Sequence, residues 1–525
     1  MTEMQPSLAR PRAASAGPAL SRLLRASSLY MVANLASRAV GFLAVPFYSR
    51  FLSPAEYGLI ELIELSTQVV AISLGLQTFG TVITRLFHKQ PTPAGKRDVI
   101  STGLLSSALL NAFILAAAVL FSAPLAQAVF RSAEHAPLLQ AAFAAMFFSN
   151  LIEVALVYER IQERAGFYLA YSLTTLFLTL GLNVLFIGVL GAGVWGFVAS
   201  KLIVASCGAA YLARRLVREV GRRWRGDLVP HFVRLALPLT FSGLCYLVIH
   251  SSDRFFLTSF VSLEDIGRYA LAYRFAFLIT VLVGESFRKS WEVTFYRYAE
   301  QAGWQDGFGR VVCYLVLAEV AAALALAVCG QELLAFMVPP AFRPPPLLLP
   351  VLVLAYAVRD IGELYHTLLL VNQRTRTIAS IALSGAVLNL GLNALLIPAY
   401  GIHGAALATL LTWLAYTAVC CTLARREHGV PVPLTSMLGL VALALGAFAL
   451  SCATRVESLA MQCLLDAFWG LLFVAVCLAV YLPTEDRPAL RAKFVRYAAR
   501  VHRWSTRPAP RPVGGPVPRA VPEAG

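Results

Sequence analysis

The stretch FVRLALPLTFSGLCYLVIHSSDRFFLTSF, from Phe232 to Phe260, is apolar over most of its length and carries ionisable residues only at Arg234 and near its end. As a helix its 29 residues would rise about 43 Å, enough to cross a hydrocarbon layer of about 30 Å. The pattern therefore predicts a transmembrane helix. A charge at that depth costs about 2.5–3.5 kcal/mol on insertion scales, so we expect the ionisable residues to face protein or a watery cavity.

The ionisable residues near the end of this stretch are His250, Asp253 and Arg254. Asp253 and Arg254 are adjacent, so their side chains point about 100° apart around a helix. We therefore expect that they do not neutralise one another and that each has a partner on another helix.

Composition indicates a polytopic membrane protein. The 525 residues are 58% hydrophobic and 14% charged, with a mean hydropathy of +0.69, whereas soluble domains are about 25% charged. The net charge of +16 is explained by basic cytoplasmic loops, so we expect no nucleic acid partner. All nine cysteines lie in apolar segments without metal-ligand spacing, which predicts neither disulfides nor a metal site nor a cofactor.

Apolar runs of about 20 residues predict an all-α fold with about fourteen transmembrane helices. The expected spans are 28–50, 57–84, 99–122, 137–158, 167–190, 194–213, 232–260, 267–287, 310–330, 347–371, 377–398, 402–423, 434–453 and 461–482. Basic residues gather in alternate loops, around 85–97, 214–225, 288–297 and 425–426. The positive-inside rule then predicts that both termini are cytoplasmic, in an inner membrane.

The chain repeats itself at a spacing of about 210 residues. The turn FLSPAEYG at 51–58 returns as FVSLEDIG at 260–267, and the LGLN at 180–183 returns at 390–393. Six predicted helices separate equivalent points, so both copies enter the membrane from the same side and form two parallel six-helix repeats.

The repeat sets the predicted domain boundaries. They are a cytoplasmic tail at 1–27, an N-lobe at 28–215, a basic linker at 216–231, a C-lobe at 232–426, two extra helices within 434–482 and a basic, partly amphipathic tail at 483–525.

Three passages carry a resemblance to a known family. They are FLSPAEYG at 51–58, SSDRFFLTSFVSLEDIGRYALAYR at 251–274 and LNLGLNALLIPAYGIHGAALATLL at 388–411. The chain resembles the polysaccharide transporters, of the O-antigen flippase kind, within the multidrug/oligosaccharidyl-lipid/polysaccharide exporter superfamily. The resemblance implies V-shaped lobes around a central cavity lined by helices 1, 2, 7 and 8.

On those helices Arg38, Arg254 and Arg274 predict a cationic cavity for an anionic headgroup. Guanidinium groups match pyrophosphate oxygens bidentately, and a low dielectric strengthens the pairing. The alternative for Arg254 is a side chain that reaches the nearby membrane surface.

Buried carboxylates supply a second set of candidates. If transport is coupled to an ion, Glu64, Asp253 and Asp360 are candidate carriers, because such groups can be moved toward neutral-pH titration. On helix 10, Arg359 and Glu363 stand at i and i+4, which makes an ion pair geometrically available, with either a structural or a transport role.

These features predict a flippase that moves a polyprenyl-pyrophosphate-linked oligosaccharide across the inner membrane by alternating access, for O-antigen or exopolysaccharide biosynthesis. A cation-coupled small-molecule exporter and a lipid II flippase are alternatives, and a polysaccharide polymerase or ligase is a more distant one. We find no catalytic constellation and expect no enzyme. The expected partners are the lipid-linked glycan, the bilayer and, as candidates, polysaccharide polymerase or chain-length regulator proteins.

Overall fold

The computed structural model describes residues 36, 40–288, 291, 295, 303–371, 375–454, 456 and 458–481. These residues form helices joined by turns, with no strand among them, which confirms the expected all-α fold. The predicted tails at 1–27 and 483–525 lie outside the described residues, and so does Arg38.

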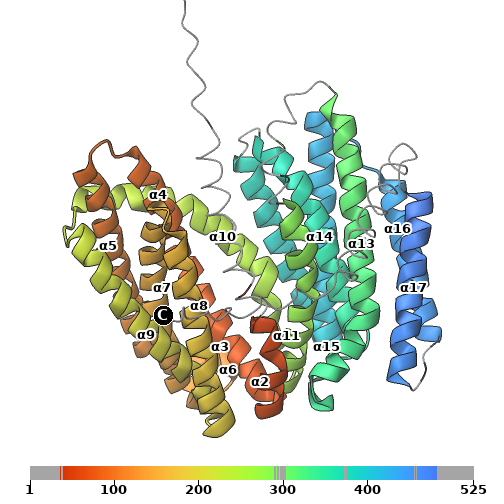
Figure 1. The fold of residues 1–525 in the computed structure, drawn as a ribbon, viewed down its shortest axis with the longest axis horizontal. Coiled ribbons are helices and arrows are strands. Elements are labelled where there is room, and N and C mark those ends of the chain that lie inside the picture. Colours follow the sequence, from red (N-terminus) through yellow and green to blue (C-terminus); the bar gives the residue numbers. More distant parts are fainter. Residues whose placement is uncertain are drawn as a thin grey trace, which may run out of the picture.

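Helices α2 to α9 form the first group, which we call the N-lobe (Figure 1). Their bounds are α2 Val45–Phe51, α3 Pro54–Ser73, α4 Phe79–Lys89, α5 Pro93–Leu120, α6 Ser122–Phe130, α7 Ala136–Ile161, α8 Ala165–Asn183 with the π-helix η3 Val184–Val189, and α9 Gly193–Val220. The span predicted at 57–84 is broken between α3 and α4. Gly75 takes a left-handed conformation there, with φ of 71°, which costs glycine little.

Helices α10 to α15 form the second group, the C-lobe. Their bounds are α10 Val229–Leu257, α11 Leu263–Ala276 with the π-helix η5 Thr280–Gly284, α13 Trp304–Met337, α14 Leu348–Val371 and α15 Thr375–His428. Two further helices follow, α16 Leu434–Ala453 and α17 Leu459–Val480. Helix α15 covers both spans predicted at 377–398 and 402–423, which meet at a non-helical Gly401.

Nine of the helices in the described residues are long and apolar enough to cross a membrane. One of these is α15, which joins two predicted spans end to end. Helices α3 and α14, each with several charged residues, occupy two more of the predicted positions. The α-helices follow the predicted order, and most of their ends lie within a few residues of the predicted ones.

The two lobes share one hydrophobic core at the end of the molecule where α3 and α11 begin. That core joins Leu62 and Phe143 of the N-lobe to Ile266 and Leu271 of the C-lobe. Two further cores lie largely within the C-lobe and the N-lobe. In Figure 1 the lobes accordingly meet at the bottom of the view and diverge toward the top. We call the end where they meet the closed end.

Two glycines at equivalent positions of the repeat make the closest contact between the lobes. A Cβ on Gly58 would lie 2.3 Å from the carbonyl oxygen of Leu263, and a Cβ on Gly267 would lie 2.0 Å from that of Pro54. Real Cβ atoms do not approach that closely, so only glycine allows α3 and α11 to touch backbone to backbone. The motif that revealed the repeat thus forms the closed end.

Helix α10, which contains most of the apolar stretch at 232–260, contacts both lobes. Near its start Phe232 stacks on Phe79 with ring centroids 6.2 Å apart, inside the core of the N-lobe. Near its end Ile249 lies in the core of the C-lobe. Pro238 stands within the helix and has no N–H to donate to the preceding turn. Helix α10 therefore crosses from one lobe to the other.

Candidate functional site

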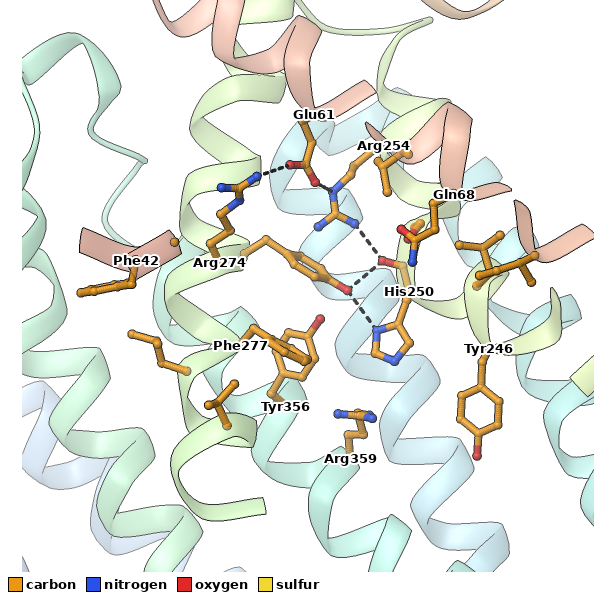
Figure 2. Close-up of a pocket in the computed structure, with 18 of the residues that line it drawn as sticks. Phe42, Glu61, Gln68, Tyr246, His250, Arg254, Arg274, Phe277, Tyr356 and Arg359 are labelled. Atoms are coloured by element: carbon orange, nitrogen blue, oxygen red, sulfur yellow. Dashed lines mark hydrogen bonds and ion pairs between the residues drawn. The ribbon is translucent and has the colours of Figure 1, made fainter. Parts of the chain in front are cut away.

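A cavity of about 650 Å³ lies between the two lobes. It is lined by residues 41–45 before and within α2, by α3 of the N-lobe, and by α10, α11 with the residues that follow it, and α14 of the C-lobe. This matches the lining implied by the family resemblance and adds α14. The charged side chains that line it are those of Glu61, Arg254, Arg274 and Arg359 (Figure 2).

Glu61 of the N-lobe bridges two arginines of the C-lobe. Its Oε1 lies 3.2 Å from Nε of Arg254, and its Oε2 lies 3.4 Å from Nη2 of Arg274 (Figure 2). The Arg254 contact is an ion pair without hydrogen-bond alignment. One carboxylate therefore neutralises parts of two guanidinium groups and ties α3 to both α10 and α11.

Arg254 is buried, with only 3% of its side chain exposed. The expectation that it does not pair with Asp253 is wrong: Nη1 of Arg254 lies 3.4 Å from Oδ1 of Asp253, and the same oxygen accepts a hydrogen bond from the Arg254 backbone N–H at 2.9 Å. A flexible arginine stem can fold back toward its neighbour, which the helix angle alone does not reveal. The alternative in which Arg254 reaches the membrane surface is excluded by its burial.

Aromatic residues hold Arg254 in place. Its guanidinium carbon lies 3.7 Å from the ring centroid of Tyr273, and Nη1 donates to the carbonyl oxygen of His250 at 2.8 Å. The hydroxyl of Tyr273 donates to the same carbonyl at 2.8 Å. Stacking of this kind stabilises a cation by roughly 0.5–2 kcal/mol. Arg254 is thus fixed in one orientation, with its Nε toward Glu61.

Asp253 does not open onto the cavity. It is buried, and its Oδ2 accepts a 2.5 Å hydrogen bond from the hydroxyl of Tyr269. With Arg254 on its other oxygen, its acceptor positions are occupied within the C-lobe. The contacts therefore favour a structural role for Asp253 over the predicted role as an ion carrier.

Arg274 is the more accessible of the two arginines, with 36% of its side chain exposed. Besides Glu61 it contacts Oε2 of Glu64 at 3.5 Å, and Glu64 also pairs with Lys201 of α9. Glu64 is therefore held between two cations. Of the three arginines predicted to form a cationic cavity, Arg254 and Arg274 line it together with Arg359, and Glu61 of the N-lobe faces them.

Helix α14 contributes Arg359, but not through the predicted ion pair. The carboxylate nearest to Arg359 is that of Asp360, 3.4 Å from its Nη1. Glu363 instead accepts hydrogen bonds at 3.2 Å from the hydroxyls of Tyr246 and Tyr416. These two tyrosines occupy the carboxylate that Arg359 was expected to use. Arg359 points into the cavity instead and has no donor bond from its Nε.

Asp360 has a definite partner of its own. Its Oδ2 accepts a 2.7 Å hydrogen bond from the hydroxyl of Thr280, the first residue of the π-helix η5. His366 lies 4.0 Å from Glu363.

The predicted span at 57–84 contains Glu61, but the sequence analysis gave this residue no role. Its position could have indicated one, because Glu61 stands one turn after Gly58, on the helix that faces the second lobe.

Comparison with known proteins identifies the family. Residues 23–291, slightly more than half of the chain, match the sequence model of the family described as polysaccharide biosynthesis protein. The chain belongs to this family. The resemblance predicted from its repeated turns is thereby confirmed.

Several solved structures of transporters and flippases share the fold. The lipid II flippase MurJ in an inward closed conformation superposes with a TM-score of 0.68 at 15% identity, covering 85% of this chain and 98% of that one. An inward-facing multidrug resistance MATE family transporter gives 0.58 at 15% identity, with 74% and 94% covered. A MOP superfamily transporter from Pyrococcus furiosus gives 0.52 at 15%, with 77% and 95% covered. No curated protein matches the sequence.

Proposed function

We propose that this protein is a flippase for a polyprenyl-pyrophosphate-linked oligosaccharide in surface polysaccharide biosynthesis. One observation carries the proposal: three arginines of the C-lobe converge on the cavity, and Glu61, the one carboxylate among the described residues that line it, is shared by two of them. An incoming diphosphate offers more acceptor oxygens than one carboxylate and carries more charge. It therefore competes with Glu61 for the same guanidinium groups.

Competition for the arginines gives substrate binding a way to open the closed end. Glu61 is on the N-lobe and its partners Arg254 and Arg274 are on the C-lobe, so the ion pairs hold the lobes together. When the diphosphate takes the arginines, that inter-lobe attraction is lost. A ligand shifts a conformational equilibrium only by its differential affinity for the two states, and here the differential term is the displaced carboxylate.

The positive-inside rule indicates which side of the membrane the cavity faces. The basic loops at 85–97 and 214–225 lie at the end opposite the closed end, so the cavity opens toward the cytoplasm in this conformation. A volume of about 650 Å³ suits the diphosphate and the first sugars, since ligand sites usually measure about 300–1,000 Å³. The polyprenyl tail remains in the lipid while the headgroup crosses.

A second candidate is a cation-coupled exporter of small amphipathic molecules. It is favoured by the carboxylates of Glu61 and Glu64, which could bind a cationic substrate if the arginines moved away. A multidrug resistance MATE family transporter has the same fold, which supports this alternative. Its cavity chemistry is the reverse of that of the flippase, because the carboxylates and not the arginines would contact the substrate.

A transport assay in reconstituted liposomes distinguishes the flippase from the exporter. The purified protein is inserted into vesicles that contain a polyprenyl-diphosphate-linked oligosaccharide, and the exposure of the glycan on each leaflet is followed with a membrane-impermeant lectin. We expect protein-dependent equilibration of the glycan across the bilayer and no efflux of a lipophilic cation. Efflux of the cation without movement of the glycan would replace the flippase by the exporter.

A further inference from the structure

Glu319, in the middle of α13, is a buried carboxyl. It is 0% exposed, and neither of its oxygens has a hydrogen-bond donor among the residues that the structure describes. The carboxylates of Glu61 and Glu64, by contrast, each contact the guanidinium group of Arg274. An ionised carboxylate left in this way in a low-dielectric site is strongly disfavoured relative to its neutral form. The burial of Glu319 therefore favours its neutral, protonated form.

The groups around Glu319 come from the helices that pack on α13. The charges that act on it are those of Asp360 and Arg359, both on α14. Those that act on Asp360 are Arg359, Glu363 and Arg288, together with the hydroxyl of Thr280. Helix α17 also packs on α13, and the carboxylate of its Asp466 is bonded through Oδ1 to Ser451 and Gln462. The anion that acts on Glu319 is thus Asp360, which has donors of its own.

The packing around Asp360 is close. Thr280 and Gly284 begin and end the π-helix η5, and a Cβ on Gly284 would lie 2.3 Å from Oδ2 of Asp360. π-Helical turns interrupt the regular ladder and are frequent at functional sites. The absence of a side chain at Gly284 lets α14 bring its carboxylate against the helix that lines the cavity.

We infer that Glu319 is a proton-binding site, neutral in the conformation with the closed end shut, and that Asp360 on the adjacent α14 is ionised in the same conformation. Asp360 keeps its charge because the hydroxyl of Thr280 donates a hydrogen bond to it and the guanidinium group of Arg359 lies 3.4 Å from it. Glu319 has neither kind of partner, so protonation removes the cost of its burial. Two carboxyl groups in different environments thereby take different charge states.

Arg359 connects this pair to the cavity. It lines the cavity, and its Nη1 lies 3.4 Å from Asp360 and 3.5 Å from Thr280. An anion in the cavity that draws Arg359 toward itself takes away the positive charge that favours ionised Asp360. Binding of the anion then favours uptake of a second proton by the pair. This step rests on the proposed function, whereas the protonation of Glu319 does not.

Infrared difference spectroscopy tests the proton site without any substrate. The spectrum of the wild type minus that of Glu319→Gln at neutral pH should show the carbonyl band of a protonated carboxylic acid. The matched control Glu61→Gln removes an ion-paired group and should show carboxylate bands instead. Loss of carboxylate bands in Glu319→Gln, as for a site that holds a sodium ion, would overturn the inference. Glu319→Leu provides the same spectrum if the Gln variant does not fold.

Proton uptake tests the connection to the cavity. Undecaprenyl diphosphate is added to the purified protein in a weakly buffered detergent solution, and binding and pH are recorded together. We expect proton uptake on binding, and loss of most of that uptake in Asp360→Asn with binding retained. Binding without uptake would overturn the coupling through Arg359. If the lipid does not bind at all, the proposed function fails and the coupling fails with it, while the infrared result still decides the site at Glu319.

Discussion

The two lobes share a frame but differ in charge. Counting from the paired glycines, Glu61 stands three residues after Gly58, and the residue three after Gly267 is Ala270. Seven residues after each glycine the charged residue is on the other lobe, because the N-lobe has Leu65 and the C-lobe has Arg274. The repeat thus keeps the backbone contact symmetric while the cavity receives its acid from one lobe and its base from the other.

This difference suggests how a symmetric fold becomes a directional binding site. A fully symmetric pair of lobes would place like charges opposite one another and repel at the closed end. Opposite charges instead attract, and they hold the lobes together until a competitor arrives. In the proposed flippase, the C-lobe supplies the groups for an anionic substrate, and the N-lobe supplies the anion that the substrate displaces.

The largest effect is expected from Arg274→Gln. The change removes the most accessible cation of the cavity, and a hydrogen bond to a charged group contributes about 1.5–3 kcal/mol. We expect translocation of the lipid-linked glycan to fall by about 100-fold at the upper end of that range. The matched control is Arg268→Gln, whose arginine pairs with Asp265 at the closed end and not in the cavity. Equal losses in both variants would remove the special role of Arg274.

A smaller loss is expected from Gly267→Ala, which tests the symmetric part of the comparison. The added Cβ would meet the Pro54 carbonyl at 2.0 Å, so α3 and α11 must separate. Overpacking of this kind usually costs about 1–3 kcal/mol, which corresponds to a decrease of roughly tenfold in the closed population. Gly391→Ala is the control, because nothing lies within 4 Å of its Cβ position. Translocation assays on both variants show whether the closed contact is required.

Glu61→Gln is expected to shift the equilibrium with a moderate loss of transport. The variant keeps the shape of the side chain but removes the charge that joins α3 to Arg254 and Arg274. Amide hydrogen exchange in the first turns of α3 and α11 should become faster by several-fold as the closed end opens. Exchange as slow as in the wild type would show that the glycine contact alone holds the lobes together.

The smallest effects concern the caps that begin α3 and α11. Ser53 forms a reciprocal capping box with Glu56, and Ser262 accepts from the backbone of Asp265 at 3.2 Å. Each Ser→Ala change should lower stability by about 0.5–2 kcal/mol, seen as a lower thermal midpoint. Ser53→Ala should cost at least as much as Ser262→Ala, because its box satisfies two backbone donors. The reverse order would show that tertiary contacts dominate at these ends.

Much of the fold could be predicted from the sequence because membrane spans are long and apolar. The repeat was visible in FLSPAEYG at 51–58 and FVSLEDIG at 260–267, and the serine caps and glycine contact of the structure explain why those letters recur. The break at Gly75 was missed, since a hydropathy window passes over a short turn. The two halves of α15 were separated correctly at Gly401.

The site was less predictable, because its pairings depend on the positions of side chains on different helices. Helix geometry argued against a contact between Asp253 and Arg254, but the arginine stem bends back to form one. Spacing favoured Arg359 with Glu363, but Tyr246 and Tyr416 from α10 and α15 take the carboxylate. Charges within single helices could be located from the sequence; their partners across the lobes could not.

The central claim is that an anionic headgroup displaces Glu61 and so opens the closed end. It is tested by the distance between spin labels at Glu134 and Glu264, two exposed positions at that end, one on each lobe. Addition of a polyprenyl-diphosphate-linked oligosaccharide should lengthen the distance in the wild type and leave it unchanged in Arg274→Gln. Bound substrate with an unchanged distance in the wild type, or equal lengthening in both proteins, would contradict the account.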